Sequence, residues 1–180
     1  MKFIPTEIPG VIVIEPEVFE DGRGFFFESY RRDVFLREGI RKEFIQDNHS
    51  RSMKGALRGL HYQAAPREQA KLIRVIHGEV FDVAVDIRKG SKTFGQHVTT
   101  ILSAENHKML YVPEGFAHGF LSLQEDTELL YKVTELYSHE HERGIRWDDP
   151  ALGIPWPKLV AAAILSEKDL NYPSLKEIEF

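Results

Sequence analysis

The sequence predicts an all-β fold, either a sandwich or a barrel. Short segments rich in β-branched and aromatic residues recur along the 180 residues, and turn signals such as residues 88–91 and 113–115 separate them. Helical periodicity is scarce by comparison. Many short strands at regular spacing are typical of sheets packed or closed around one core, so a single domain is expected.

The expected strands can be taken in chain order. Residues 11–15 are apolar and β-branched, and residues 24–30 are aromatic-rich after a turn signal at residues 20–22. Later strands are expected at residues 57–63, 72–76, 79–87, 96–102, 109–112, 119–123 and 128–136.

The segment 79–87 has the clearest period of two, which predicts a half-buried strand. Its two faces carry different residues: Phe81, Val83, Val85 and Ile87 on one, and Val80, Asp82, Ala84 and Asp86 on the other.

Helical signals are confined to short stretches. Residues 33–39 form one candidate, with Asp33 as the N-cap and Gly39 as the stop, and one or two further turns are expected after Trp147. The first 50 residues are irregular and rich in Phe, so they are expected to form edge strands that pair with a second subunit.

Composition excludes several classes of chemistry. The chain has no cysteine, which excludes disulfides, thiolate metal sites and a cysteine nucleophile. A formal charge of −5 argues against general nucleic-acid affinity. The N-terminus lacks the apolar core of a signal peptide, and the longest strongly apolar run, residues 159–165, is too short for a bilayer. A cytoplasmic protein without membrane contact is therefore expected.

Reactive side chains gather in four segments. His61 lies in the segment 58–63, and Lys71 begins an otherwise apolar alternation. His118 follows a Pro-x-Gly-x-x-His turn, and Tyr131 and Tyr137 have the same parity. Each has a structural alternative: a hydrogen-bonded buried histidine, a lysine that reaches the rim, or aromatic core residues.

Two further segments carry weaker signals. Arg23 lies between two glycines, which suits either a mobile basic group near a phosphate or a plain surface turn. Residues 46–51 are strongly polar, and they form either a loop or a pocket wall that offers hydrogen bonds.

The segments 55–78 and 113–118 resemble the two motifs of cupins. Metal-binding cupins supply His-x-His and a glutamate from the first motif, but here Gln63 stands where the second histidine is expected. His61 and His118 alone make a poor site for a divalent ion, and the Lys71 ammonium would repel one. No metal is therefore expected.

Over nearly the whole chain the sequence resembles the dTDP-4-dehydrorhamnose 3,5-epimerase family. The resemblance rests on six motifs in order: residues 21–26, 44–50, 57–63, 69–75, 113–120 and 165–169. It implies a cupin jelly-roll β-barrel with N-terminal exchange strands and short C-terminal helices. The single domain 1–180 would divide into edge or dimer strands (1–50), a barrel core (51–140) and a C-terminal segment (141–180).

The resemblance also implies roles for individual residues. His61 resembles the general base, Asp169 the carboxylate that orients it and raises its basicity, Tyr131 the acid on the opposite face, and Lys71 the cation that stabilises an enolate. Tyr137 resembles the aromatic that stacks on thymine. The substrate-binding positions would be Arg23, Phe26, Glu28, Gln46, Asp47, Asn48, Arg58, Lys71, His118, Tyr137, Glu142 and Lys168.

The implied reaction is epimerisation at C3 and C5 of a dTDP-4-keto-6-deoxy sugar, without a cofactor. The implied partner is a second copy, whose N-terminal strands reach this site. Alternatives are a single-carbon epimerase or ketoisomerase, a metal-dependent cupin oxygenase, and a non-catalytic sugar-binding cupin. One conflict stands out: on a straight strand Arg58 and His61 have opposite parity, so both face a ligand only if Gly59 permits a bulge.

Overall fold

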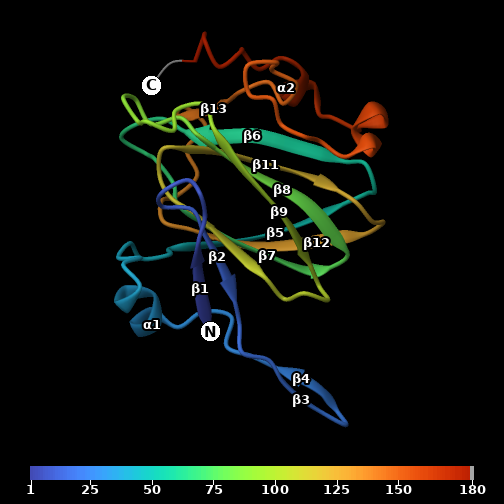
Figure 1. The fold of residues 1–180 in the computed structure, drawn as a ribbon. Helices are drawn as coiled ribbons and strands as arrows, with labels where there is room; N and C mark the ends of the chain where they lie inside the picture. Colours follow the sequence, from blue (N-terminus) through green and yellow to red (C-terminus); the bar gives the residue numbers. More distant parts are fainter. Residues whose placement is uncertain (179–180) are drawn as a thin grey trace.

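Two facing β-sheets form the body of the protein in a computed structural model that describes residues 1–178 (Figure 1). The six-stranded sheet has the order β1 (Lys2–Pro5), β2 (Ile12–Glu15), β10 (Met109–Val112), β7 (Lys71–His77), β12 (Thr127–Val133) and β5 (Gln46–Ser52). The five-stranded sheet has the order β13 (Glu142–Gly144), β6 (Leu57–Gln63), β11 (Phe116–Ser122), β8 (Glu79–Asp86) and β9 (His97–Ser103). Hydrogen bonds do not close the two sheets into one barrel, and the all-β, cupin-like prediction is confirmed in this open form.

The remaining elements are short and lie outside the two sheets. A hairpin of β3 (Phe19–Asp21) and β4 (Gly24–Phe26) projects away from the body in Figure 1. Helix α1 (Arg32–Arg37) follows it, and the C-terminal segment holds the 3-10 helix η1 (Lys158–Ala162) and α2 (Glu167–Leu170). No helix within residues 1–178 is both long and apolar enough to cross a membrane.

Three apolar clusters hold these layers together. One lies between the sheets and includes Ile73, Ala84 and Leu129. A second covers the outer face of the five-stranded sheet with residues of the C-terminal segment, and a third covers the outer face of the six-stranded sheet with Phe35 of α1. Burial of this apolar area is the main force that favours the fold.

Strand β8 is buried on both faces, which corrects the half-buried strand expected there. Val80 and Ala84 face the cluster between the sheets, whereas Val83 and Val85 pack against the C-terminal segment. The two faces do differ as the alternation predicts. The outer face is covered because the chain after β13 folds back over it, which a local pattern does not reveal.

A bulge in β6 resolves the conflict between Arg58 and His61. Opposite β11, His61 pairs with His118 and Arg58 pairs with Phe120, so three steps on β6 match two on β11. Gly59 has a φ of 126°, and a Cβ there would lie 2.4 Å from the Cα of Gly119. Only glycine permits this close approach, and the shift turns Arg58 and His61 toward the same side.

Several predicted bounds need correction. Helix α1 begins two residues earlier than expected, with Arg31 at the N-cap, because Asp33 bonds to Arg31 and Arg37 instead of capping the helix. Gly39, at a φ of 86°, does follow the helix end. The aromatic strand expected at residues 24–30 ends at Phe26, because β4 is paired only within its short hairpin.

Four strands were not among those expected: β1, β3, β5 and β13. The sequence allows the polar segment 46–51 to be either a loop or a pocket wall, and in the structure it forms β5, which is a wall. This strand lacks apolar alternation because one face meets solvent and the other meets a polar cavity. Polar residues on both faces hide a strand from any pattern based on hydrophobicity.

Candidate active site

The candidate site lies between the two sheets, where strands from both contribute polar side chains. Two adjoining hollows of about 170 and 150 Å³ share His61, Lys71 and Tyr131. A third hollow of about 460 Å³ reaches His61 from the side of α2. His61 therefore stands where all three meet.

His61 is hydrogen-bonded to a carboxylate that is distant in sequence. Its Nε2 lies 2.5 Å from Oδ1 of Asp169, which is 4% exposed. The Ser166 hydroxyl caps α2 and donates to the other carboxylate oxygen at 2.7 Å. Asp169 is thus fixed from both sides, and it in turn fixes the orientation of the imidazole.

Burial lowers the pKa of His61 below its ordinary value of 6.5, although the hydrogen bond and the charge of Asp169 act in the opposite direction. The expected gain in basicity from Asp169 is therefore present but outweighed by desolvation. The pKa of Asp169 is also lowered: burial raises it, but the bonds from His61 and Ser166 dominate. At neutral pH the pair is a neutral imidazole beside a carboxylate.

Lys71 lies on the cavity side of β7, with its Nζ 3.4 Å from the carbonyl oxygen of His61. Burial lowers its pKa to about 8, and the charges of Asp82 and Glu142 limit the decrease. The ammonium is therefore still the dominant form at pH 7. Among the described residues, no carboxylate forms an ion pair with Lys71. Its ammonium is therefore available to an anion in the cavity.

His118 is held by a second buried carboxylate. Its Nε2 lies 2.9 Å and 3.1 Å from the two carboxylate oxygens of Asp82, which is fully buried on β8. His118 pairs with His61 across the sheet, and both line the site. The site thus contains two His–Asp pairs side by side.

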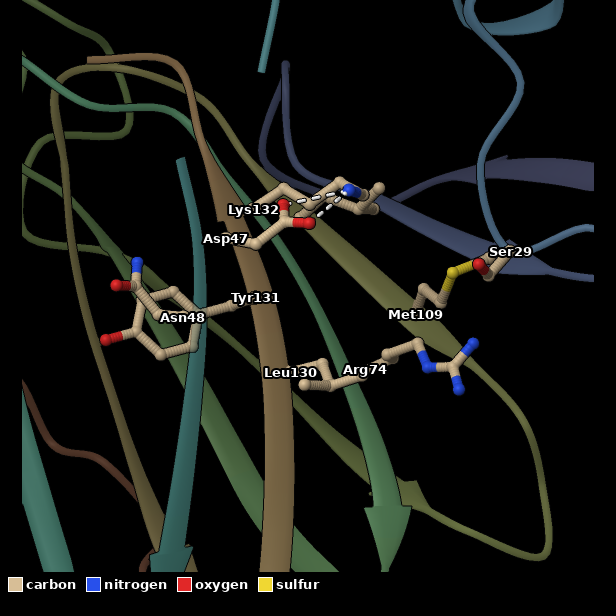
Figure 2. A pocket seen from close by; sticks show the side chains of 9 residues that line it. Ser29, Asp47, Asn48, Arg74, Met109, Leu130, Tyr131 and Lys132 are labelled. Carbon is tan, nitrogen blue, oxygen red and sulfur yellow. Dashed lines mark hydrogen bonds and ion pairs between the residues drawn. The ribbon is translucent and has the colours of Figure 1, made fainter. Parts of the chain in front are cut away.

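Tyr131 faces the cavity from β12. Figure 2 shows Tyr131 and Asn48 on one side of this strand, with Arg74 and Met109 on the other. Burial raises the pKa of Tyr131, so its hydroxyl stays protonated at neutral pH. A neutral phenol and a neutral imidazole therefore approach one cavity from the two opposing sheets.

The model of the family described as dTDP-4-dehydrorhamnose 3,5-epimerase matches residues 5–177. An enzyme of that name from Shigella flexneri is 56% identical over 95% of this chain and 94% of its own. The chain belongs to the dTDP-4-dehydrorhamnose 3,5-epimerase family.

Solved structures agree with this assignment. RmlC from Legionella pneumophila, in complex with dTDP-4-keto-L-rhamnose, is 48% identical, with a TM-score of 0.95 over 99% of this chain and 94% of that chain. ChmJ from Streptomyces bikiniensis, a 3'-monoepimerase in complex with dTDP-quinovose, is 36% identical. Its TM-score is 0.90, and the match covers 96% of this chain and 87% of that chain. The fold is therefore common to double and single epimerases.

In this family member the rim of the site carries a chain of polar contacts. The Tyr137 hydroxyl donates to Glu142 at 2.9 Å, and Glu142 also forms an ion pair with Lys168. Burial would raise the pKa of Glu142, but these contacts lower it. Tyr137 lies beyond the end of β12, so it reaches the site through a loop and not through shared strand parity with Tyr131.

Gln63, which stands where metal-binding cupins have the second histidine of His-x-His, has a structural role here. Its side chain is 6% exposed, donates to the carbonyl of Leu136 at 3.3 Å, and accepts from the Ser138 amide at 2.7 Å. Both contacts flank Tyr137 and fix its loop. Within residues 1–178, no three His, Asp or Glu side chains are grouped as a metal site would need.

Most of the residues expected at the site are brought together by the fold. Gln46, Asn48, Tyr137 and Glu142 line one hollow, and Arg58 and His118 line another. Lys168 lines the hollow beside α2. Contributions from six strands and a helix therefore converge around His61.

The fold does not bring the other four expected residues to this cavity. Arg23 and Phe26 are exposed on the projecting hairpin, and Glu28 follows it. Asp47 points to the outer face of β5, where it pairs with Lys132 at 2.8 Å beside a separate hollow of about 290 Å³ (Figure 2).

Asp82 was not identified as a site residue from the sequence. Asp82 had a signal, because the alternation in residues 79–87 places a carboxylate on a face shared with Val80 and Ala84. A buried charge needs a partner, and this argument leads to a nearby histidine or lysine. Ser50 belongs to the polar segment 46–51, for which the sequence allows a pocket wall, and its buried hydroxyl has no hydrogen-bond partner among the described residues.

Proposed function

We propose that this chain epimerises dTDP-4-dehydro-6-deoxy-D-glucose at C3 and C5 and so forms dTDP-4-dehydro-L-rhamnose. One observation carries the proposal: the His61–Asp169 pair and the Tyr131 phenol border one cavity from opposite sheets, with the Lys71 ammonium beside them. The relationship to enzymes named for this reaction supports it.

His61 is the base in the proposed mechanism. Its ring nitrogen not bonded to Asp169 takes the proton from the carbon next to the C4 ketone, and the C–H electrons form the C=C bond of an enolate. Asp169 then stabilises the imidazolium. Because burial lowers the pKa of His61 below its ordinary value of 6.5, the imidazole is largely neutral near pH 7, which is the form that accepts a proton.

Lys71 and Tyr131 complete the inversion. The Lys71 ammonium stabilises the negative charge that develops on the C4 oxygen, in a cavity between the two sheets where charges are screened less than in bulk water. Tyr131 donates its phenolic proton to the opposite face of the same carbon, and the C4 carbonyl re-forms. Solvent then reprotonates the tyrosinate and deprotonates the imidazolium, and a second cycle acts on the other carbon. We propose that no metal or cofactor takes part, because every step is a proton transfer and the Lys71 ammonium, which lines the same cavity as both histidines, would repel a divalent ion.

Solvent deuterium uptake tests the reaction. The purified protein is incubated in D₂O with the dTDP-4-keto-6-deoxyglucose substrate, and the product is examined by NMR. We expect label at both C3 and C5. Label at one carbon would instead support a single-carbon epimerase, the alternative favoured by the likeness to the 3'-monoepimerase.

The rim residues are proposed to hold the nucleotide. Tyr137 would stack on thymine, with Gln46 and Asn48 beside it on the same hollow. Arg58 and Lys168, which both line the hollow next to α2, would meet the diphosphate. Asp47 would act only through its backbone, since its side chain is turned away from the cavity.

Tyr131→Phe should separate proton removal from inversion. The variant keeps the ring but loses the proton that Tyr131 delivers, so washout of substrate hydrogen by His61 should persist while inverted product falls about 10²-fold or more. Quench-flow with NMR of recovered substrate and product measures both rates. Tyr111→Phe, a matched change on β10 outside the site, should leave both unchanged. Equal losses of washout and product in Tyr131→Phe would contradict a separate acid.

A homodimer is proposed in which the β3–β4 hairpin reaches the partner's site. The hairpin exposes 57% of Phe19, 61% of Phe25 and 66% of Phe26, and it leads away from the body (Figure 1). Apolar side chains gathered on one projecting element favour a covering partner. Arg23, paired here with Asp21, and Glu28 would then contact the substrate bound to the other subunit.

Mixing two variants tests this arrangement. Arg23→Ala and His61→Asn each weaken every site in their own homodimers. In a mixed dimer one site regains both residues if Arg23 acts across the interface, so random exchange should restore about a quarter of wild-type activity. The mixture is assayed at low substrate after subunit exchange. Activity no greater than the sum of the two variants would show that Arg23 does not act on the partner's site.

A further inference from the structure

We propose that Tyr172 is a positioning residue for His61: its ring packs against the imidazole, holds it in the orientation bonded to Asp169, and excludes water from that side. Tyr172 lies outside the six family motifs and has no role in the proposed mechanism. The inference rests on the proposed role of His61 as the base, and it adds the means by which that base is held and kept dry.

The contact between the two rings is direct. Their centroids lie 5.6 Å apart at an interplanar angle of 66°, an edge-to-face arrangement. Tyr172 follows α2, three residues after Asp169, and the Arg146 amide donates to the carbonyl of Pro173 at 2.9 Å. One anchored segment therefore brings both the carboxylate and the aromatic ring to His61.

Gly144 leaves the space that this ring occupies. It pairs with His61 between β13 and β6, so it lies directly beside the base. A Cβ at Gly144 would lie 2.5 Å from atoms of the Tyr172 ring. The Tyr172 ring thus packs directly against the Gly144 backbone opposite His61, and no room remains for water between this ring and Gly144.

The hydroxyl group does not explain why a tyrosine stands at position 172. Its oxygen is buried and has no hydrogen-bond partner among the described residues. Burial also raises the pKa of this phenol above its ordinary value, so it carries no charge near pH 7. Since a buried hydroxyl without a partner destabilises a fold, the useful part of the side chain is the ring.

The ring has a measurable electrostatic consequence. Burial is the main cause of the lowered pKa of His61, and Tyr172 supplies part of that burial. Removing the ring admits water, which favours the charged imidazolium and raises the pKa of His61. The other groups that face His61 remain in place: Asp169 and Lys168 from the α2 segment, Lys71 from β7, Glu142 from β13, His118 from β11, Tyr131 from β12 and Arg58 on β6.

NMR titration of the His61 imidazole tests the proposal without relying on turnover. The signal is assigned by its loss in His61→Asn. We expect Tyr172→Ala to raise the pKa of His61 by roughly half a unit or more, and Tyr172→Phe to retain the wild-type value. Leu170→Ala, an exposed change at the end of α2 two residues before Tyr172, is the matched control. An unchanged titration in Tyr172→Ala, or an equal shift in Tyr172→Phe, would overturn the role of the ring.

Activity supplies the second measurement. In Tyr172→Ala the acid limb of kcat/KM should move to higher pH by the same amount as the NMR titration, because only neutral His61 removes a proton. If that variant does not fold, Gly144→Ala displaces the ring instead and should shift the titration in the same direction. Absence of deuterium uptake by the wild type would contradict the proposed function, whereas normal uptake with an unshifted titration would contradict only the inference about Tyr172.

Discussion

Replacing His61 with asparagine lowers deuterium incorporation at both C3 and C5 by about 10²–10⁴-fold, the range typical of a lost general base. Asparagine still fits the space and can donate to Asp169, which lies 2.5 Å from the imidazole, but it has no nitrogen that accepts a proton at neutral pH. Both exchange reactions fall together because one imidazole serves both carbons.

The measurement is single-turnover exchange in D₂O, with binding of dTDP measured by calorimetry on the same protein. Binding should persist, because the nucleotide contacts lie on the rim. His49→Asn is the matched control, since His49 pairs with Glu128 on the outer face of β5. Retention of roughly a tenth of wild-type exchange in His61→Asn would remove His61 as the base.

Replacing Lys71 with methionine lowers kcat by about 10²–10³-fold with little change in KM, as expected for a group that acts on developing charge. Methionine retains the length and the apolar part of the side chain beside Ile73 but removes the ammonium. The enolate oxygen then has no cation to stabilise it, whereas the neutral ketone loses little.

The pH profile gives an independent check on Lys71. Because the pKa of Lys71 is about 8, the wild type should lose activity as pH rises through that value and the ammonium becomes neutral. Lys71→Met should lack this basic limb and keep the acid limb that belongs to His61. Lys132→Met, which removes an outer-face lysine paired with Asp47, should keep both limbs. A loss confined to KM would show that Lys71 binds substrate without stabilising the enolate.

Local pattern was a sound guide to the strands that have an apolar face. The bounds expected for 57–63 and 109–112 agree with β6 and β10, and most other strands differ only at their ends. It failed for β5, whose alternate residues face solvent and a polar cavity. For β8 the pattern predicted the strand but not its burial, because the second buried face depends on residues of the C-terminal segment.

The sequence by itself determined the chemistry available to this protein. The absence of cysteine excluded thiol chemistry, and the resemblance of the motifs that contain His61, Lys71 and Asp169 to one family implied proton transfer next to a ketone. Such motifs are visible because they are contiguous in the chain and each carries its own spacing.

Only the tertiary structure decided how these groups act on one another. Asp169 reaches His61 from 108 residues away, Asp82 holds His118 from another strand, and Tyr172 covers the base through the space that Gly144 leaves. The shift at Gly59 turns Arg58 and His61 to the same side. Each of these effects depends on burial or on contact between distant segments, so it arises only when the two sheets and the C-terminal segment pack together.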